Sequence, residues 1–327
     1  MPHAEDASGG PRVIPVRLAR ASGSGFGVDD VSCAAATQLG LFAAQGLAVT
    51  WSDWRGGVAA TRAVLEGKAD AAYAGFGPVI AARADGHPCR IFVSQARALA
   101  QALVVRQGIG DLRGKTWAVD GIGALSHHMA RLVVRALGIG ESEIRWEAVG
   151  PPPERIAALL EGRVDASLIR TEEALALDRD RAERVRRLLD FDELKRLVPL
   201  QPHGVLMSTE AYERGRPEVL LGLAKAMIFA SRALHDDAGV FMKVVREHVA
   251  VKLSDAELQL MWQREHSSGG WAVNGELTRG HWEAQLRLYR DLNPDTRAIT
   301  IEELIAGRFV PEALAAIGIH PARFDQP

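Results

Sequence analysis

The feature of this sequence that most constrains its fold is an internal repeat. The nine residues AVLEGKADA that begin at Ala63 recur, with conservative changes, as ALLEGRVDA beginning at Ala158, an offset of 95 residues. The paired landmarks are Ala63 and Ala158, Trp51 and Trp146, and, shifted by one more residue, Gly25 and Gly121. Landmarks that keep their order and spacing indicate one structural plan used twice. Because the period is long and occurs only twice, a solenoid is excluded, and we predict two lobes of similar fold.

Apolar periodicity and glycine positions predict the same order of elements in both lobes. Short apolar strands alternate with helices, which is typical of βαβ units and mainly parallel sheets. In the first lobe we predict strands at 13–19, 47–52, 70–75 and 90–95, and helices at 30–45, 57–67 and 78–86. In the second we predict strands at 116–119, 143–147 and 165–169, and helices at 125–137 and 153–161. Helices at 217–235, 238–249, 254–265 and 278–292 would then pack back on one lobe.

Two local signals refine this outline. Gly46 is placed to end the first helix, and Ser254 with Glu257 forms the capping-box pattern that opens a helix. The charged runs 179–187 and 190–193 are interpreted as solvated helix faces.

Composition excludes several classes of protein. Lys and Arg number 39 against 41 Asp and Glu, a net charge of −2, which argues against nucleic acid as the main partner. The two cysteines, Cys33 and Cys89, cannot form a disulfide framework or a thiolate-based zinc site, and both are interpreted as buried packing. No apolar run approaches the roughly 20 residues needed to span a bilayer.

The motifs and their order resemble a known family. They are Gly-Leu-Phe followed by Gly-Leu-Ala-Val at 40–49, Leu-Glu-Gly-Lys-Ala-Asp at 65–70, Gly-Phe-Gly-Pro at 75–78, Asp-Leu-Arg-Gly-Lys at 111–115, and Gly-Ile-Gly with Ser-His-His at 121–128. Over residues 13–290 the chain resembles the type II periplasmic-binding-protein fold. Within that fold it is similar to the NMT1/SsuA-like substrate-binding proteins of ABC transporters, which bind nitrate, sulfonates, taurine or thiamine precursors.

The resemblance implies an α/β protein with two lobes, an interlobe ligand cleft and a helical C-terminal region. Lobe 1 would comprise residues 13–101 with 203–327, lobe 2 residues 102–202, and residues 1–12 would be a flexible N-terminus. Such proteins close like a Venus flytrap, because a ligand held between the lobes favours the closed state.

Candidate ligand-binding residues follow the strands of lobe 1, since ligands bind at the carboxyl ends of the strands in open α/β sheets. They are Ser22, Ser24 and Phe26 in the glycine-rich loop, then Trp54, Phe76, Arg97 and, at the return from lobe 2, His203. Phe76 could equally be ordinary core. The loop imitates a dinucleotide fingerprint, but Gly23, Gly25 and Gly27 have the wrong spacing for one, and the repeat argues against that interpretation.

In lobe 2 the candidates lie at a helix start and at a strand end. They are Gly123, Ser126, His127, Arg170 and Thr171. A helix N-terminus presents unpaired amides to an anion, and a guanidinium can hold a carboxylate or sulfonate with two hydrogen bonds. The alternatives are that Ser126 only caps its helix and that Arg170 pairs with Glu172 or Glu173. His127 and its neighbour His128 point about 100° apart on a helix, so we predict no metal site there.

These observations predict a solute-binding protein that captures a small anionic organic ligand, namely a sulfonate, a carboxylate or a thiamine precursor, for an ABC-type importer. We predict no catalytic residue, no cofactor and no metal. The partners would be the ligand and a permease but no nucleic acid, and the chain would be a monomer. The alternative is a cytoplasmic enzyme on the same scaffold, of the decarboxylase, desulfinase or pyrimidine-synthase type.

Location remains open between these hypotheses. Residues 1–12 contain no basic segment followed by an apolar one, so we predict no signal peptide in the chain as given. A binding protein for an importer would be periplasmic after removal of a signal, whereas a chain that starts at Met1 would be cytoplasmic.

Overall fold

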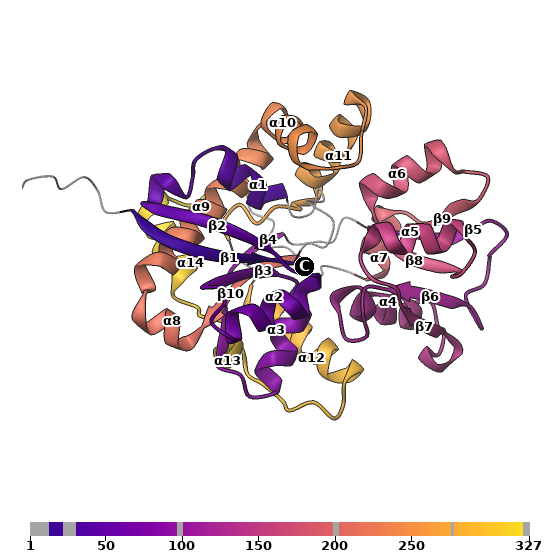
Figure 1. Cartoon of the computed structure of the whole chain (residues 1–327), viewed down its shortest axis with the longest axis horizontal. Helices are drawn as coiled ribbons and strands as arrows, with labels where there is room; N and C mark the ends of the chain where they lie inside the picture. The colour runs from indigo at the N-terminus through magenta and orange to yellow at the C-terminus, as the bar shows by residue number, and fades with distance from the viewer. Residues whose placement is uncertain (1–12, 22–30, 97–100, 199–202, 276–277, 323–327) are drawn as a thin grey trace, which may run out of the picture.

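The computed structural model describes residues 13–21, 31–96, 101–198, 203–275 and 278–322. Within these residues the chain forms two lobes, each built on a five-stranded sheet that is flanked by helices (Figure 1). The predicted two-lobed α/β fold is therefore confirmed. None of the described helices combines the length and the apolar character needed to cross a membrane.

The sheet of lobe 1 has the strand order β2-β1-β3-β10-β4. Its strands are β1 (Ile14–Arg20), β2 (Leu47–Asp53), β3 (Ala71–Ala74), β4 (Cys89–Ala96) and β10 (His203–Thr209). Its first helices are α1 (Val31–Gln38), α2 (Gly56–Leu65) and α3 (Phe76–Ala84). β1 runs parallel to β2 and β3, whereas β10 is antiparallel to both β3 and β4. The strand β10 returns to lobe 1 from a distant part of the chain, and local periodicity did not predict it.

The sheet of lobe 2 has the order β7-β6-β8-β5-β9. Its strands are β5 (Gln101–Arg106), β6 (Thr116–Val119), β7 (Arg145–Ala148), β8 (Ala166–Arg170) and β9 (Val185–Leu189). Its helices are α4 (Leu125–Ala136), α5 (Pro152–Leu160), α6 (Thr171–Asp180) and α7 (Phe191–Leu197). Because β5 is antiparallel to β8 and β9, the prediction of mainly parallel sheets holds only for three strands in each lobe.

The two lobes repeat the same core, as the sequence predicted. The parallel triplets β2-β1-β3 and β7-β6-β8 have the same order, and α2 and α5 lead into the third strand of each. Asp70 accepts a hydrogen bond from the Arg17 amide at 2.7 Å, and Asp165 accepts one from the Thr116 amide at 2.9 Å. The repeated Leu-Glu-Gly-x-x-Asp motif thus ends a helix and ties the next strand to its neighbour.

Two predicted helical segments are wrong. Residues 30–45 do not form one helix, because α1 ends at Gln38 and Gly40 adopts a positive φ of 65° before a 3₁₀ turn at Ala43–Gln45. Gly46 does end this segment in the left-handed conformation, as predicted. The charged run 179–187 was interpreted as a helix face, yet only Arg179 and Asp180 belong to α6, and the run continues into β9, where Val185 is buried.

The C-terminal third is helical, as predicted. It comprises α8 (Glu210–Gly215), α9 (Pro217–Asp236), α10 (Ala238–His248), α11 (Asp255–Ser268), α12 (Arg279–Leu292), α13 (Ile301–Leu304) and α14 (Phe309–Ile317). The long helix α9 lies against the lobe 1 sheet with Leu223 and Met227 fully buried in its core. The Ser254 capping box forms, since its hydroxyl accepts from the Glu257 amide at 3.3 Å.

The chain passes between the two sheets twice, after β4 and before β10. Both crossings, residues 97–100 and 199–202, lie outside the described residues, so the predicted lobe boundaries stay a prediction. Helix α12 touches both lobes, because Trp282 packs in a lobe 1 cluster and Leu292 packs in the lobe 2 core. Figure 1 places α12 beside α3 and α4, which belong to different lobes.

Candidate ligand-binding cleft

A cleft lies between the lobes at the carboxyl ends of the parallel strands, with a cavity of about 100 Å³. The lobe 1 residues that line it are Ala21, Gly56, Gly57, Gly75 and Pro78. The lobe 2 residues that line it are Gln101, Asp120, Ala124, Leu125, Ser126, Pro151, Pro152, Arg155 and Arg170. Among the described residues that line the cleft, those of lobe 1 are small or apolar, whereas lobe 2 supplies all the polar and charged ones.

Five of the helices whose starts lie in the described residues begin at this cleft, and none of these five has a side-chain cap. They are α2 and α3 from lobe 1 and α4, α5 and α6 from lobe 2. Away from the cleft, six described helices are capped by an Asp, Ser or Thr side chain, namely α7, α8, α10, α11, α12 and α13, whereas α9 and α14 are not. Uncapped helix N-termini carry unpaired amides and positive potential. α5 is an exception for the amides, because Pro152 and Pro153 have no N–H and the Glu154 amide donates to the Pro151 carbonyl at 3.0 Å, so it adds only its dipole. The convergence of these N-termini favours an anion.

Arg155 is the most deeply buried charge in the cleft. Its Nε donates to the Gly150 carbonyl at 3.1 Å, and its Nη1 donates to Ser167 Oγ at 3.0 Å and to the Leu168 carbonyl. Burial lowers the pKa of this guanidinium, and the nearby carboxylates of Asp120 and Glu173 act in the opposite direction. A guanidinium remains charged under all ordinary conditions, so the cleft holds a fixed cation.

The lobes approach closely at two glycines. A Cβ added to Gly75 would lie 2.8 Å from Leu125 Cδ2, and one added to Gly56 would lie 3.0 Å from Asp120 Oδ2. Both neighbours belong to lobe 2. These positions therefore require glycine for the lobes to meet as they do in this structure.

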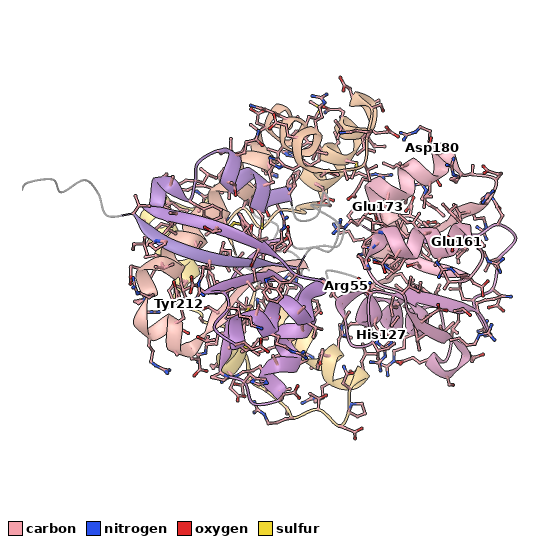
Figure 2. All side chains as sticks on the ribbon, in the orientation of Figure 1. Arg55, His127, Glu161, Glu173, Asp180 and Tyr212 are labelled. Carbon is pink, nitrogen blue, oxygen red and sulfur yellow. The ribbon has the colours of Figure 1, made fainter. Side chains whose placement is uncertain are left out.

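Ion pairs connect the lobes around the cleft. Arg55 Nη2 lies 2.7 Å from Glu154 Oε2, and Figure 2 shows Arg55 between the two lobes. On α6, Arg179 Nη1 lies 3.2 Å from Glu257 Oε1 of α11. A third connection is made by Arg131, which donates to Asn293 Oδ1 at the end of α12 at 3.1 Å.

Of the predicted site residues, the structure brings Ser126 and Arg170 to the cleft. Ser126 Oγ accepts a hydrogen bond from the Asp120 amide at 2.8 Å, so its own proton is left to donate elsewhere. Arg170 occupies the N-cap position of α6. Whether either residue binds a ligand stays a prediction.

The other described candidates lie away from the cavity lining. Gly123, at a φ of 82°, donates its amide to His127 Nδ1 at 3.0 Å, and the His127 ring packs against Trp146. Burial, with a smaller contribution from Arg131, lowers the pKa of His127. Phe76 and Thr171 are buried at the first positions of their helices, and Trp54 donates to Ser52 Oγ at 2.9 Å.

The remaining candidates cannot be placed in the same way. Ser22, Ser24, Phe26 and Arg97 lie outside the described residues. His203 begins β10, where its Cα pairs with that of Ala96.

Sequence reasoning missed Arg155, Asp120 and the pair Gly56–Gly57. A signal for Arg155 was present in the repeat, because the same offset of 95 residues places buried Ala60 at the equivalent position of lobe 1. An arginine in place of a core alanine on the inner face of a helix indicates a buried site where a positive charge makes specific hydrogen bonds. Asp120 carried a weaker signal as the residue directly after β6.

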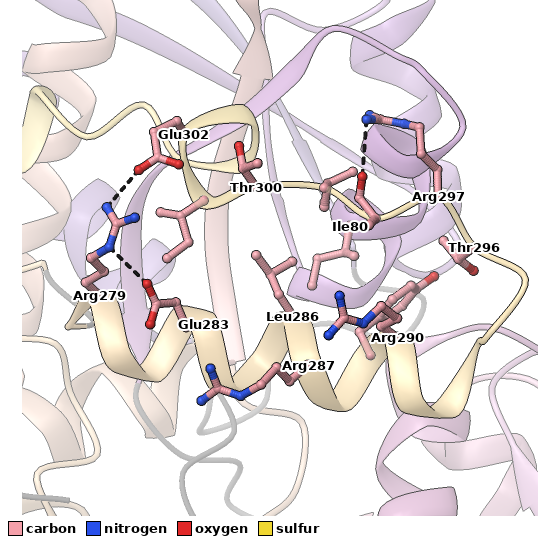
Figure 3. Close-up of a pocket in the computed structure, with 14 residues that line it drawn as sticks. Ile80, Arg279, Glu283, Leu286, Arg287, Arg290, Thr296, Arg297, Thr300 and Glu302 are labelled. Carbon is pink, nitrogen blue, oxygen red and sulfur yellow. Dashed lines mark hydrogen bonds and ion pairs between the residues drawn. The ribbon is translucent and has the colours of Figure 1, made fainter.

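A larger hollow of about 310 Å³ lies on lobe 1 beside α12, away from this cleft (Figure 3). Two of its four lining arginines are ion-paired, since Arg279 pairs with Glu283 and Glu302, and Arg297 pairs with Glu303. The other two, Arg287 and Arg290, lie on the surface of α12. The hollow also receives none of the five uncapped helices, so we favour the interlobe cleft as the ligand site. In the described part of the chain, no three His, Cys, Asp or Glu side chains gather to hold a metal.

Comparison with known proteins agrees with this architecture. A protein from Bordetella bronchiseptica RB50 has a similar structure, with a TM-score of 0.77, 19% identity, and coverage of 93% of this chain and 98% of that chain. The alkanesulfonate-binding protein SsuA from Xanthomonas axonopodis pv. citri, bound to MOPS, gives a TM-score of 0.69 at 21% identity, covering 91% and 97%. The periplasmic nitrate-binding protein NrtA from Synechocystis PCC 6803 gives 0.70 at 14% identity, covering 95% and 90%.

At these identities the likeness concerns the fold alone. A search of curated proteins found no match. The family model described as NMT1/THI5 like matches residues 31–232, which is more than half of the chain. The chain therefore belongs to the NMT1/THI5-like family.

Proposed function

We propose that this protein is a solute-binding protein that captures a small organic acid between its lobes and delivers it to an ABC-type importer. The observation that carries the proposal is the convergence of five uncapped helix N-termini on a cleft that also holds buried Arg155. Backbone amides and a fixed guanidinium together form a site for a carboxylate or sulfonate.

The relatives support the same class of ligand. By their names, SsuA binds alkanesulfonates and NrtA binds nitrate, and both ligands are anions. This chain shares their fold, and its cleft lies at the strand ends where open α/β sheets bind ligands.

In this proposal the ligand acts by stabilising the closed state. The two lobes would move as units about the two crossings. A ligand that contacts both cleft faces lowers the free energy of the closed form relative to the open form. A permease would then recognise the closed form.

We do not propose the alternative enzymatic function. Catalysis by a thiol would need an exposed, activated cysteine, yet Cys33 and Cys89 are both buried. Burial raises the pKa of the Cys89 thiol to about 11. The hydroxyl of Ser126 is held by the Asp120 amide, and among the described residues that line the cleft no histidine stands ready as its base.

A thermal-shift screen tests this proposal. Carboxylates, sulfonates and their neutral amides are added to the full chain. Each compound that stabilises the protein is then recovered, and its molecular mass is measured by mass spectrometry. A ligand at 100 times its Kd should stabilise the fold by about 2.7 kcal/mol. We expect acids to stabilise the protein and to be recovered unchanged. Turnover of a stabilising acid, or stabilisation by none of them, would contradict the proposal.

A further inference from the structure

The space between the lobes continues beyond the central cleft. A groove of about 430 Å³ lies between α5 and α6 of lobe 2 and the segment that joins α10 to α11 of lobe 1. Arg170 lines both the cleft and this groove, so the two spaces meet at the N-terminus of α6. The groove is therefore an extension of the same interlobe space.

The middle of the groove is apolar. Ile156 and Leu160 of α5 line it from one side, packed against a lobe 2 core cluster. Val251, which packs against the lobe 1 core, lines it from the other side. An apolar group placed here would contact apolar side chains of both lobes, so both of its faces would be removed from water.

The charged residues of the groove lie at its two ends along α6. Arg170, Glu172 and Glu173 lie at the start of the helix, near the cleft. Asp180 and Arg181 lie at its end, and Figure 2 shows Glu173 and Asp180 at these opposite ends. Between them the α6 residues that line the groove are Ala176 and Leu177. A ligand that follows this path would thus meet a polar end, an apolar middle and solvent.

The volume of the cavity indicates how large a ligand it can enclose. The central cavity is about 100 Å³, which is below the roughly 300–1,000 Å³ of pockets that enclose drug-sized ligands. Cleft and groove together fall within that range. The cleft alone would suit only an acidic head group.

We propose that the ligand is an organic acid with an extended apolar part, whose acidic group lies beside Arg155 and Arg170 and whose apolar part lies in the groove of Ile156, Leu160 and Val251. This inference rests on the proposed function, since it names the ligand class of the same site. It predicts that affinity depends on the apolar length of the acid.

Isothermal titration calorimetry of a chain-length series tests the inference. Linear carboxylates and sulfonates with about 3 to 10 carbons are titrated into the full chain, beside the neutral amides of the same chains. Each methylene that enters the groove should lower Kd about fourfold until the groove is full. Binding should also show a negative heat-capacity change that grows with chain length.

Two variants locate the effect, one on each lobe. Ile156→Ser removes apolar surface from the lobe 2 wall, and Ala250→Asp places a carboxylate at an exposed groove position of lobe 1. Both should flatten the dependence of Kd on chain length. The matched control is Ile319→Ser, which removes an isoleucine that is 59% exposed outside the groove, and it should retain the full dependence.

The outcomes separate the two proposals. A length dependence that both groove variants reduce and the control keeps supports the inference. Acids that bind with the same Kd at every length would overturn it and leave the proposed function standing. If no acid binds at all, or if the amides bind as well as the acids, the proposed function fails as well.

Discussion

The two lobes share a scaffold but not a surface chemistry. Both have the same parallel triplet, and both tie it with an aspartate at equivalent positions, Asp70 and Asp165. At the positions equivalent to the cleft residues Arg155 and Arg170, however, lobe 1 has the core residue Ala60 and Gly75. The repeated residues maintain the sheet, and the residues that differ determine what each lobe can bind.

This difference assigns separate tasks to the lobes. Among the described residues that line the cleft, both arginines belong to lobe 2, so lobe 2 should bind the acidic group first. Lobe 1 presents glycines and the uncapped ends of α2 and α3, which allow close approach of the backbone. We therefore expect lobe 1 to close over a ligand that lobe 2 already holds. The following changes test that division, from the largest expected effect to the smallest.

Loss of the Arg155 guanidinium should have the largest effect. Arg155→Lys keeps the charge but not the forked hydrogen bonds, and we expect organic acid binding to weaken by about 2–5 kcal/mol. Calorimetry measures this, with circular dichroism as a check of folding. The matched lobe 1 variant, Ala60→Ser, should change Kd by less than about threefold, since it removes no charged contact. An equal loss in both variants would contradict the division of tasks.

Acid should weaken the contact between the lobes through His128. Its ring packs edge-on against Phe76 of lobe 1 and stacks on Tyr289 of α12. Burial, with smaller effects of Arg131 and His127, lowers the pKa of His128 to about 4. Because the unfolded chain binds this proton near pH 6.5 and the folded chain does not, the free energy of unfolding should fall as pH drops from 6.5 toward 4.

The full effect is about 3 kcal/mol, since each pKa unit corresponds to about 1.4 kcal/mol. Urea denaturation at pH 7 and at pH 5 gives the free energy of unfolding at each pH, and the difference measures the part of this effect that falls between them. The variant His128→Phe keeps an aromatic ring between the lobes, and its free energy of unfolding should no longer show the part of the pH dependence that His128 causes. A variant with the same pH dependence as the original chain would refute the role of His128.

Arg170→Ala should weaken acid binding by about 1–3 kcal/mol, because one charge-assisted hydrogen bond is lost. Its partner in the repeat, Gly75→Ala, adds a methyl group 2.8 Å from Leu125 Cδ2 and should oppose closure instead. Small-angle scattering distinguishes the two, since only Gly75→Ala should enlarge the liganded form. Equal scattering profiles for the two liganded variants would argue against a steric role of Gly75.

The smallest effect is expected at the exposed pair Arg55 and Glu154, which joins the lobes at the surface. Exposed ion pairs contribute about 0–1 kcal/mol. A double-mutant cycle with Arg55→Ala and Glu154→Gln, read by ligand Kd, should give a coupling energy within that range. A larger coupling would mean that surface charge, rather than the cleft, controls closure.

The sequence predicted the repeated parts of the fold because their signals are local. Buried strands such as β3 and β8 follow a glycine-ended helix and an aspartate, and the chain carries that pattern twice. The antiparallel strands β5, β9 and β10 were missed, because each is defined by a partner distant in sequence. Likewise, the helix before Gly46 was drawn too long, since apolar periodicity does not reveal the left-handed turn at Gly40.

The cleft was predicted less completely than the fold. Ser126 and Arg170 directly flank a helix start or a strand end, and position alone brought them to the cleft. Phe76, Trp54 and His127 have similar positions, but their side chains pack into the protein. Side-chain direction depends on packing between distant segments, which is also why the substitution of Arg155 for Ala60 in the repeat did not by itself identify a cleft residue.

The central claim is that the cleft recognises the acidic group of its ligand. The most direct measurement is calorimetric titration of one organic acid and of its neutral amide, which has nearly the same shape, into the unmodified chain at low and moderate salt. We predict that the acid binds at least about 100-fold more tightly, as expected for loss of a charge-assisted hydrogen bond of about 1.5–3 kcal/mol at more than one donor. Equal affinity for the acid and the amide would contradict the account.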